Sequence, residues 1–317
     1  MNIFKSFIFL FFLICSLNAN PLLPTKRLVA SGGVTDLVIN NSKLYAATSS
    51  SSVDIFDIKT KKFENKIVLP KIRDFMGDII NSKVYSVDVL NNKVLILSQG
   101  KKGGRNIDIY ENGKLTNIIS DKKRLFIGRA KFINKDKIIF SLLSNQLFLY
   151  DLKQKTKIYS KQISQSRFSY FSLDEKKEKI VIADESGNLQ LLNVSSGELI
   201  KTFKNQNLDN VFQVDFKNDK ILTAGQDRRA VFYSKNQIYY KESNFLIYSC
   251  ALNKLGNLGA YSSNENNDVT VFDTSSKIDL FKLTGNKMTI SKIIFLNSNE
   301  IIVASDDKNI NYYKLKD

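Results

Sequence analysis

The sequence predicts an all-β protein: a seven-bladed β-propeller of four-stranded antiparallel blades, closed by an N-terminal strand. Beyond residue 24, apolar residues alternate or cluster in short runs rich in Val, Ile, Phe and Tyr. Polar turns separate these runs, which is the pattern of β-strands. Seven of the runs recur at similar spacing, starting at residues 43, 93, 137, 179, 220, 257 and 300. Steps of 37 to 50 residues match the roughly 40–45 residues of a four-stranded propeller blade.

Each repeat contains the same elements in the same order. A polar residue opens a short apolar strand, expected at 43–48, 93–98, 137–142, 179–184, 220–225, 257–262 and 300–305. A strand with an aromatic or apolar end follows, at 53–57, 107–110, 147–151, 189–193, 230–233, 269–273 and 310–314. An outer strand then follows a turn such as 58–62 or 152–156, and an inner strand precedes each repeat, as at 34–39 or 84–89.

The two ends of the chain predict how the ring closes. The last repeat has only three strands before the sequence stops at Asp317, so it lacks an outer strand. Residues 26–31 form one spare strand ahead of the first repeat. We expect this strand to pair beside 309–314, because closure removes two edges that would otherwise expose unpaired backbone groups.

The first 19 residues have the layout of a secretory signal peptide. Lys5 precedes an apolar run at 7–15, and the small residue Ala19 precedes a Pro two positions on. The run is shorter than the roughly 20 residues that span a bilayer, so a retained transmembrane anchor is the less favoured alternative. No paired arginines precede the run, which favours Sec-type export. We therefore expect a periplasmic protein whose single propeller domain comprises residues 20–317, without a transmembrane anchor.

The composition excludes several classes of chemistry. The sequence contains no His, which excludes His-dependent catalysis and His-ligated metal sites. Its two cysteines, Cys15 and Cys250, are too few for an iron–sulfur cluster or a Cys-ligated zinc site. Propeller enzymes with a quinone cofactor or lyase activity generally use acidic metal ligands or His in the channel, and the missing His argues against them. We expect a protein that is not an enzyme and binds no metal or cofactor. Cys250 lies in an apolar stretch and is predicted to be buried and inert.

We predict that a basic face of the propeller binds its partner. The chain carries 47 Lys and Arg against 31 Asp and Glu, a net charge of +16, and its few Arg lie in connections that a propeller places on one face. The loop 99–105 adds three cations, and we expect its glycines to make it mobile. We also interpret this loop as the source of the longest repeat step. We expect an acidic protein partner rather than nucleic acid, with an ordinary solvated basic surface as the alternative. The predicted partner-binding residues are Arg73, Lys101, Lys102, Arg105, Arg129, Arg167, Arg228 and Arg229. By contrast, the loop carboxylates Asp184, Asp227 and Asp306 are predicted to be structural.

Short motifs resemble known propeller families. The pairs Phe56-Asp57, Tyr150-Asp151 and Phe272-Asp273 stand where the WD-repeat family has Trp-Asp, although the Trp and the Gly-His pair of that family are absent. The chain therefore resembles a degenerate WD-repeat propeller. The segment 75–105 is similar to the NapL family, accessory propellers of periplasmic nitrate reductase systems. This resemblance implies a non-catalytic protein that supports assembly or activity of the reductase by binding its subunits or maturation machinery. A general envelope scaffold or assembly factor is the alternative.

Overall fold

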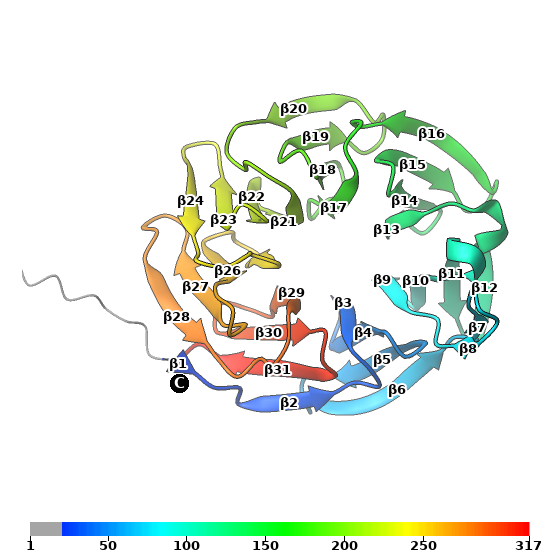
Figure 1. The fold of residues 1–317 in the computed structure, drawn as a ribbon, viewed down its shortest axis with the longest axis horizontal. Coiled ribbons are helices and arrows are strands. Elements are labelled where there is room, and N and C mark those ends of the chain that lie inside the picture. The colour runs from blue at the N-terminus through cyan, green and yellow to red at the C-terminus, as the bar shows by residue number, and fades with distance from the viewer. Residues whose placement is uncertain (1–20, 317) are drawn as a thin grey trace, which may run out of the picture.

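The computed structural model describes residues 21–316, which form a ring of seven blades around a central channel (Figure 1). The predicted fold is confirmed: every blade is a four-stranded antiparallel sheet, and the innermost strand of each sheet lines the channel. The predicted signal peptide, residues 1–19, lies outside the described residues. Across 21–316 there is no helix with the length and apolar character needed to cross a bilayer.

Blades 1 to 4 follow one another along the chain. From the channel outward, blade 1 has β3 (Val34–Asn40), β4 (Lys43–Thr48), β5 (Ser52–Asp57) and β6 (Lys62–Val68), and blade 2 has β9 (Val84–Leu90), β10 (Lys93–Gln99), β11 (Arg105–Glu111) and β12 (Lys114–Ile119). Blade 3 has β13 (Ile127–Asn134), β14 (Lys137–Leu142), β15 (Gln146–Asp151) and β16 (Thr156–Gln162), and blade 4 has β17 (Phe168–Leu173), β18 (Lys179–Asp184), β19 (Leu189–Asn193) and β20 (Leu199–Phe203).

Blades 5 to 7 complete the ring. Blade 5 has β21 (Val211–Lys217), β22 (Lys220–Gly225), β23 (Arg229–Tyr233) and β24 (Ile238–Glu242), and blade 6 has β25 (Cys250–Leu252), β26 (Leu258–Ser262), β27 (Val269–Asp273) and β28 (Asp279–Leu283). Blade 7 has β29 (Ile290–Phe295), β30 (Glu300–Ser305), β31 (Asn309–Lys314) and, as its outer strand, β2 (Lys26–Val29).

The N-terminal segment closes the ring as predicted. β2 pairs antiparallel with β31, from Lys26 opposite Tyr312 to Val29 opposite Asn309. The short strand β1 (Pro21–Leu22) adds a second contact that the sequence did not predict, a parallel pairing with β28 at the outer edge of blade 6. The chain start therefore bridges two neighbouring blades and covers the edges of both sheets (Figure 1).

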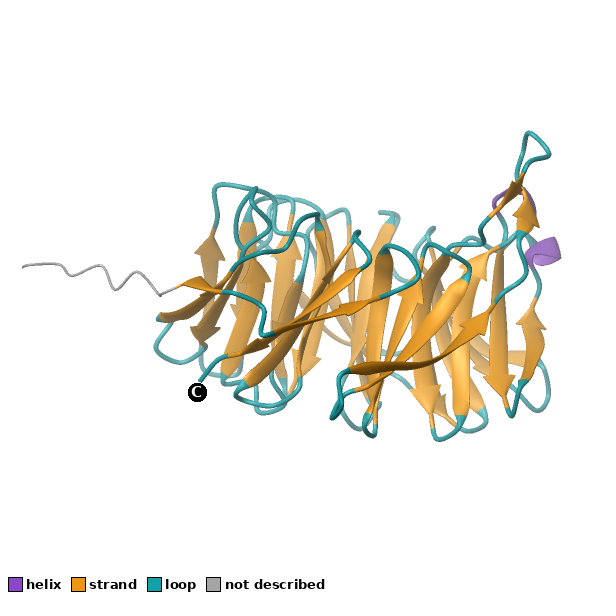
Figure 2. Ribbon diagram, turned by 90° about the horizontal axis from the view of Figure 1, so that it is seen from below, coloured by secondary structure: helices purple, strands orange, loops and turns teal. Residues whose placement is uncertain are grey.

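The connections divide the molecule into two faces. One face is formed by the connections into the inner strands and by the loops between second and third strands, and we call it the entry face. We call the opposite side the turn face. The connections of the entry face contain a two-stranded hairpin, β7 (Ile72–Arg73) and β8 (Ile79–Ile80), and the 3-10 turns η1 (Lys101–Gly103) and η2 (Asp121–Lys123). Figure 2 shows the hairpin rising above that face. The hairpin lies between β6 and β9, so it, and not the loop 99–105, produces the longest repeat step.

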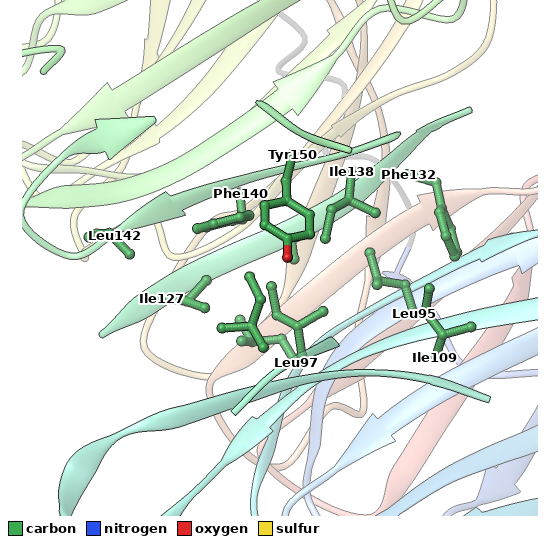
Figure 3. Packing of buried hydrophobic residues seen from close by; sticks show 12 residues of the cluster. Leu95, Leu97, Ile109, Ile127, Phe132, Ile138, Phe140, Leu142 and Tyr150 are labelled. Carbon is green, nitrogen blue, oxygen red and sulfur yellow. The ribbon is translucent and has the colours of Figure 1, made fainter. Parts of the chain in front are cut away.

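Apolar residues between neighbouring blades form the core. Between blades 2 and 3, Leu97 packs in one buried cluster with Ile127 and Phe140 (Figure 3). The ring of Phe140 also stacks on that of Phe148, with centroids 5.0 Å apart. Each fully buried Leu, Ile or Phe stabilises the fold by ~1.5–3 kcal/mol relative to exposure. Because clusters of this kind repeat around the ring, the propeller needs no disulfide.

Cys250 lies at the start of β25 and is 1% exposed. Its thiol contacts the carbonyl oxygen of Leu222 at 3.2 Å, and burial raises its pKa well above the usual value for a thiol. Since the thiolate is the reactive form, the structure supports the predicted inertness. We expect the protein from residue 20 on to release one titratable thiol with Ellman's reagent only after unfolding. Rapid labelling of the folded protein would contradict this prediction.

Candidate functional site: the entry face and the central channel

The β7–β8 hairpin displays two apolar side chains at its tip. Phe75 is 95% exposed and Met76 is 80% exposed. The tip is nevertheless an ordered turn: the guanidinium of Arg73 donates to the carbonyl oxygen of Gly77 at 2.8 Å, and the Asp74 carboxylate accepts from the backbone N–H of Asp78 at 2.9 Å. An exposed aromatic and an exposed Met on a fixed support have the character of protein-binding anchors.

Most of the predicted cations lie in or beside other connections of the entry face, from blade 2 to blade 5, and they differ in exposure. Arg167 lies 3.6 Å from Glu185, an exposed pair that holds it only weakly. Arg105 is half-buried, because its guanidinium lies 3.8 Å from the ring centroid of Tyr85 and donates to a backbone carbonyl. Arg229 stacks in the same way on Tyr240, at 4.2 Å. The predicted residues that are exposed on the entry face are Arg73, Lys101, Lys102, Arg167 and Arg228.

The glycines of the loop 99–105 allow the loop to pack closely against η2, and its mobility stays a prediction. The backbone N–H of Lys101 donates to the Asp121 carboxylate at 2.7 Å, which ties η1 to η2. At Gly104, an added Cβ would lie 2.4 Å from the carbonyl oxygen of Asp121, so only glycine permits this close approach. The loop therefore presents Lys101 and Lys102 from a defined position.

Two loop carboxylates are structural, as predicted. Asp184 is 1% exposed and accepts hydrogen bonds from Asn145 and from the Ser164 hydroxyl. Asp227 accepts from the backbone N–H of Leu208 at 2.7 Å. Within residues 21–316, no three acidic or Cys side chains converge as a metal site would require, and the absence of a bound metal stays a prediction.

Arg129 is placed differently from the other predicted residues. It lies on the inner strand β13, is 7% exposed, and points a guanidinium nitrogen at the Asp36 carboxylate 3.3 Å away. Its prediction as a surface contact is therefore corrected: a position near the start of an inner strand faces the channel and not the outer surface. The same carboxylate lies 3.6 Å from the ammonium of Lys131.

Arg129 belongs to a set of residues at matching positions of the inner strands, of which Arg129, Tyr170 and Lys292 line the channel. Every inner strand contributes one side chain at the same register position, and we call this set the plug. The plug residues are Asp36, Ser86, Arg129, Tyr170, Gln213, Cys250 and Lys292.

Contacts across the channel hold the plug together. The Arg129 guanidinium lies 4.0 Å from the ring centroid of Tyr170 in the next blade. The Lys292 ammonium reaches the Tyr170 hydroxyl at 2.7 Å, which links blades 7 and 4. The Gln213 side chain accepts from the Ser249 hydroxyl at 2.7 Å. These bonds satisfy buried polar groups that the apolar strands around them could not satisfy.

Burial and charge act together on the ionisable groups of the plug. Burial alone would raise the pKa of Asp36, but the neighbouring Arg129 and Lys131 outweigh it and hold that pKa below its usual value. Burial lowers the pKa of Lys292, and the positive charge of Arg129 lowers it further. Burial also lowers the pKa of Lys131. Asp36 and Arg129 thus favour each other's charged form, whereas the like charges of Arg129 and Lys292 oppose each other.

On the turn-face side of the plug, the channel widens into a cavity of about 700 Å³ that opens on the turn face and has the plug as its floor. Its wall includes a second set of side chains, each two residues after a plug residue. On blades 6, 7 and 1 these are the apolar Leu252, Ile294 and Val38, whereas on blades 2 to 5 they are the polar Asp88, Lys131, Ser172 and Asp215. We call this cavity the cup; this set of wall side chains is apolar on three consecutive blades and polar on the other four.

Comparisons with known proteins support the fold. The structure is similar to the β-propeller domain of Cps50 (Swd1) from Myceliophteria thermophila, with a TM-score of 0.74 and 15% sequence identity over 93% of this chain and 100% of that domain. At this identity the similarity shows a WD40-like propeller fold and nothing about partners. No known family and no curated protein matches the sequence. The resemblance to the nitrate reductase accessory family therefore rests on the segment 75–105 alone.

The sequence analysis missed the plug and the cup, although a signal for both is present. Charged residues interrupt otherwise apolar inner strands, as Asp36 does in 34–40 and Lys292 does in 290–295. A charged residue inside a buried strand requires a partner, so these positions mark groups that meet in space.

Proposed function

We propose that this protein is a non-enzymatic interaction module whose entry face binds an acidic protein in the periplasm. The observation that carries the proposal is the projecting hairpin, whose tip exposes Phe75 and Met76 among the cationic loops of the same face. Apolar anchors provide affinity where they fill a pocket of the partner, and surrounding cations accelerate the encounter with an acidic surface. The propeller fold itself is typical of protein-interaction scaffolds.

For the identity of the partner, we propose a subunit of a periplasmic nitrate reductase or a member of its maturation machinery. The proposal depends on the similarity of the segment 75–105 to the NapL family. This segment begins at the hairpin tip and ends at Arg105, so both of its ends lie on the entry face. A general envelope scaffold is the alternative, and it would use the same face with a different partner.

Charge reversal of the entry face tests the proposal. We expect Arg167→Glu/Arg228→Glu to reduce capture of the reductase subunits from periplasmic extract at least about tenfold, and to slow association with a weaker dependence on salt. Phe75→Ser should weaken binding by about 2 kcal/mol or more if it is an anchor. These residues are exposed, so none of the changes should lower the unfolding temperature.

Lysines on the turn face provide the matched control. Lys135→Glu/Lys155→Glu changes the net charge by the same amount at two exposed positions. Equal capture by the two reversed proteins would contradict an entry-face partner site. If the original protein captures other envelope proteins but not the reductase, and if reversal of the entry-face charges abolishes that capture, the scaffold alternative is favoured.

A further inference from the structure

The cup contains more positive than negative side chains, and its carboxylates already have partners. Seven Lys and Arg side chains line it against five Asp and Glu. Asp88 accepts from the backbone N–H of Phe132 at 2.8 Å, and Asp215 accepts from that of Leu252 at 2.8 Å. Both carboxylates therefore connect neighbouring inner strands, which accounts for their presence without a ligand.

The cations at the floor of the cup are less well satisfied. Among the described residues, no carboxylate oxygen lies within 4.0 Å of the Lys292 ammonium, and its hydrogen-bond partner is the neutral Tyr170 hydroxyl. Arg129 is 7% exposed, yet its Nε has no hydrogen-bond partner in the described part of the chain. A buried donor without an acceptor costs free energy, so both side chains would gain from an anion that enters the cup.

The wall above these cations is suited to an apolar group. Val38, Leu252 and Ile294 come from three consecutive blades and form an apolar stretch of the cup wall. A volume of about 700 Å³ lies within the usual ~300–1,000 Å³ of small-ligand sites, which combine apolar walls with a few placed polar groups.

We infer that the cup binds an organic carboxylate, with its charged end at Lys292 and Arg129 and its apolar body against Val38, Leu252 and Ile294. A single negative charge fits the floor of the cup because, of the three cations there, Lys292 lacks a contact ion pair among the described residues, while Arg129 and Lys131 share Asp36. The same chemistry is present in a free small acid and in the C-terminus of an apolar peptide. The cup opens on the turn face, so this site is separate from the proposed partner surface and does not depend on it.

Isothermal titration with matched acids and amides tests the inference without any mutation. The probes are 4-phenylbutanoate and 4-phenylbutanamide, and the tripeptide acetyl-Ala-Val-Phe with a free or an amidated C-terminus. We expect at least one acid to bind, and its amide to bind at least about tenfold more weakly, because only the carboxylate satisfies Lys292 and Arg129. Binding of phenylbutanoate alone indicates a small acid as the ligand, and binding of the peptide alone indicates a chain terminus.

Variants locate the binding in the cup. Lys292→Met should weaken the acid at least about tenfold and leave the amide unchanged, whereas Ile294→Asn should weaken both. Lys102→Met on the entry face and Arg167→Glu/Arg228→Glu should leave acid binding unchanged. Equal affinities of an acid and its amide would overturn the inference. So would the absence of saturable binding by either acid below about 1 mM, or an unchanged affinity in folded Lys292→Met.

Discussion

Asp36→Ala is expected to lower the free energy of unfolding by about 3–5 kcal/mol, the cost of removing one partner of a buried ion pair. Asp36 is 1% exposed and lies within 3.6 Å of both Arg129 and Lys131. Its removal leaves the buried Arg129 without a carboxylate partner and leaves Lys131 with Asp88 alone, and it also removes the acceptor for the backbone N–H of Val87. Urea unfolding monitored by circular dichroism measures the change.

An exposed ion pair provides the control for this effect. Glu64→Ala removes the partner of Lys43, where both side chains are more than 40% exposed, and should cost at most about 1 kcal/mol. The double variant Asp36→Ala/Arg129→Met should recover part of the loss, because it removes one uncompensated charge. If Asp36→Ala unfolds at the same urea concentration as the original protein, the plug contributes no net stability.

The effect of Asp36 also has a defined dependence on pH. Its folded-state pKa is lowered, so its contribution is complete above the unfolded-state value of about 3.9 and is lost as the pH falls through the folded-state pKa. The stability difference between the original protein and Asp36→Asn should therefore be largest near neutral pH and shrink in acid. A difference that grows in acid would contradict the sign of this linkage.

The fold could be predicted from the sequence because its information is local and repeated. Each strand is a short apolar run between polar turns, and seven repeats of similar length leave a propeller as the simplest closed arrangement. Even the closing strand was predictable, since the last repeat visibly lacks one. In contrast, β1 has two residues, and the pairing of Leu22 with Leu283 depends on the position of a distant edge that no local pattern specifies.

The charged residues in the inner strands mark buried positions, but the sequence does not show which of them meet, because that depends on register and ring closure. The side chains of the plug come from seven strands spread from Asp36 to Lys292, so proximity arises only after the ring closes. Most inner strands also carry a register shift immediately before the plug position, as between Val34 and Asp36 in β3. Such a bulge changes which alternate residues face the channel, so the alternation of polar and apolar residues no longer identifies the channel side. Arg129 was misassigned because its position was taken for a connection, whereas it lies within the inner strand β13.

Deleting residues 20–31 is expected to abolish cooperative folding of the propeller. The deletion exposes the outer edge of β31 and removes Leu28 and Ala30, each 5% exposed in the core between blades 7 and 1. It also removes the backbone bonds from Thr25 to Tyr312 and from Ala30 to Lys308. A closed ring becomes an open one with a free edge, which favours association between chains over folding. Size-exclusion chromatography should show aggregated material, and thermal unfolding should lose its sharp transition.

Neighbouring residues of β2 separate the contribution of packing from that of the strand itself. Leu28 points into the core, whereas Val29 is 54% exposed. Leu28→Ala should cost about 2–5 kcal/mol, as for other buried leucines, and Val29→Ala should cost about 0.5 kcal/mol or less. A synthetic peptide of residues 20–32 added to the deleted protein should restore the transition, since closure needs the strand and not its covalent connection. A deleted protein that remains monomeric and melts at the original temperature would show that blade 7 holds the ring together without β2.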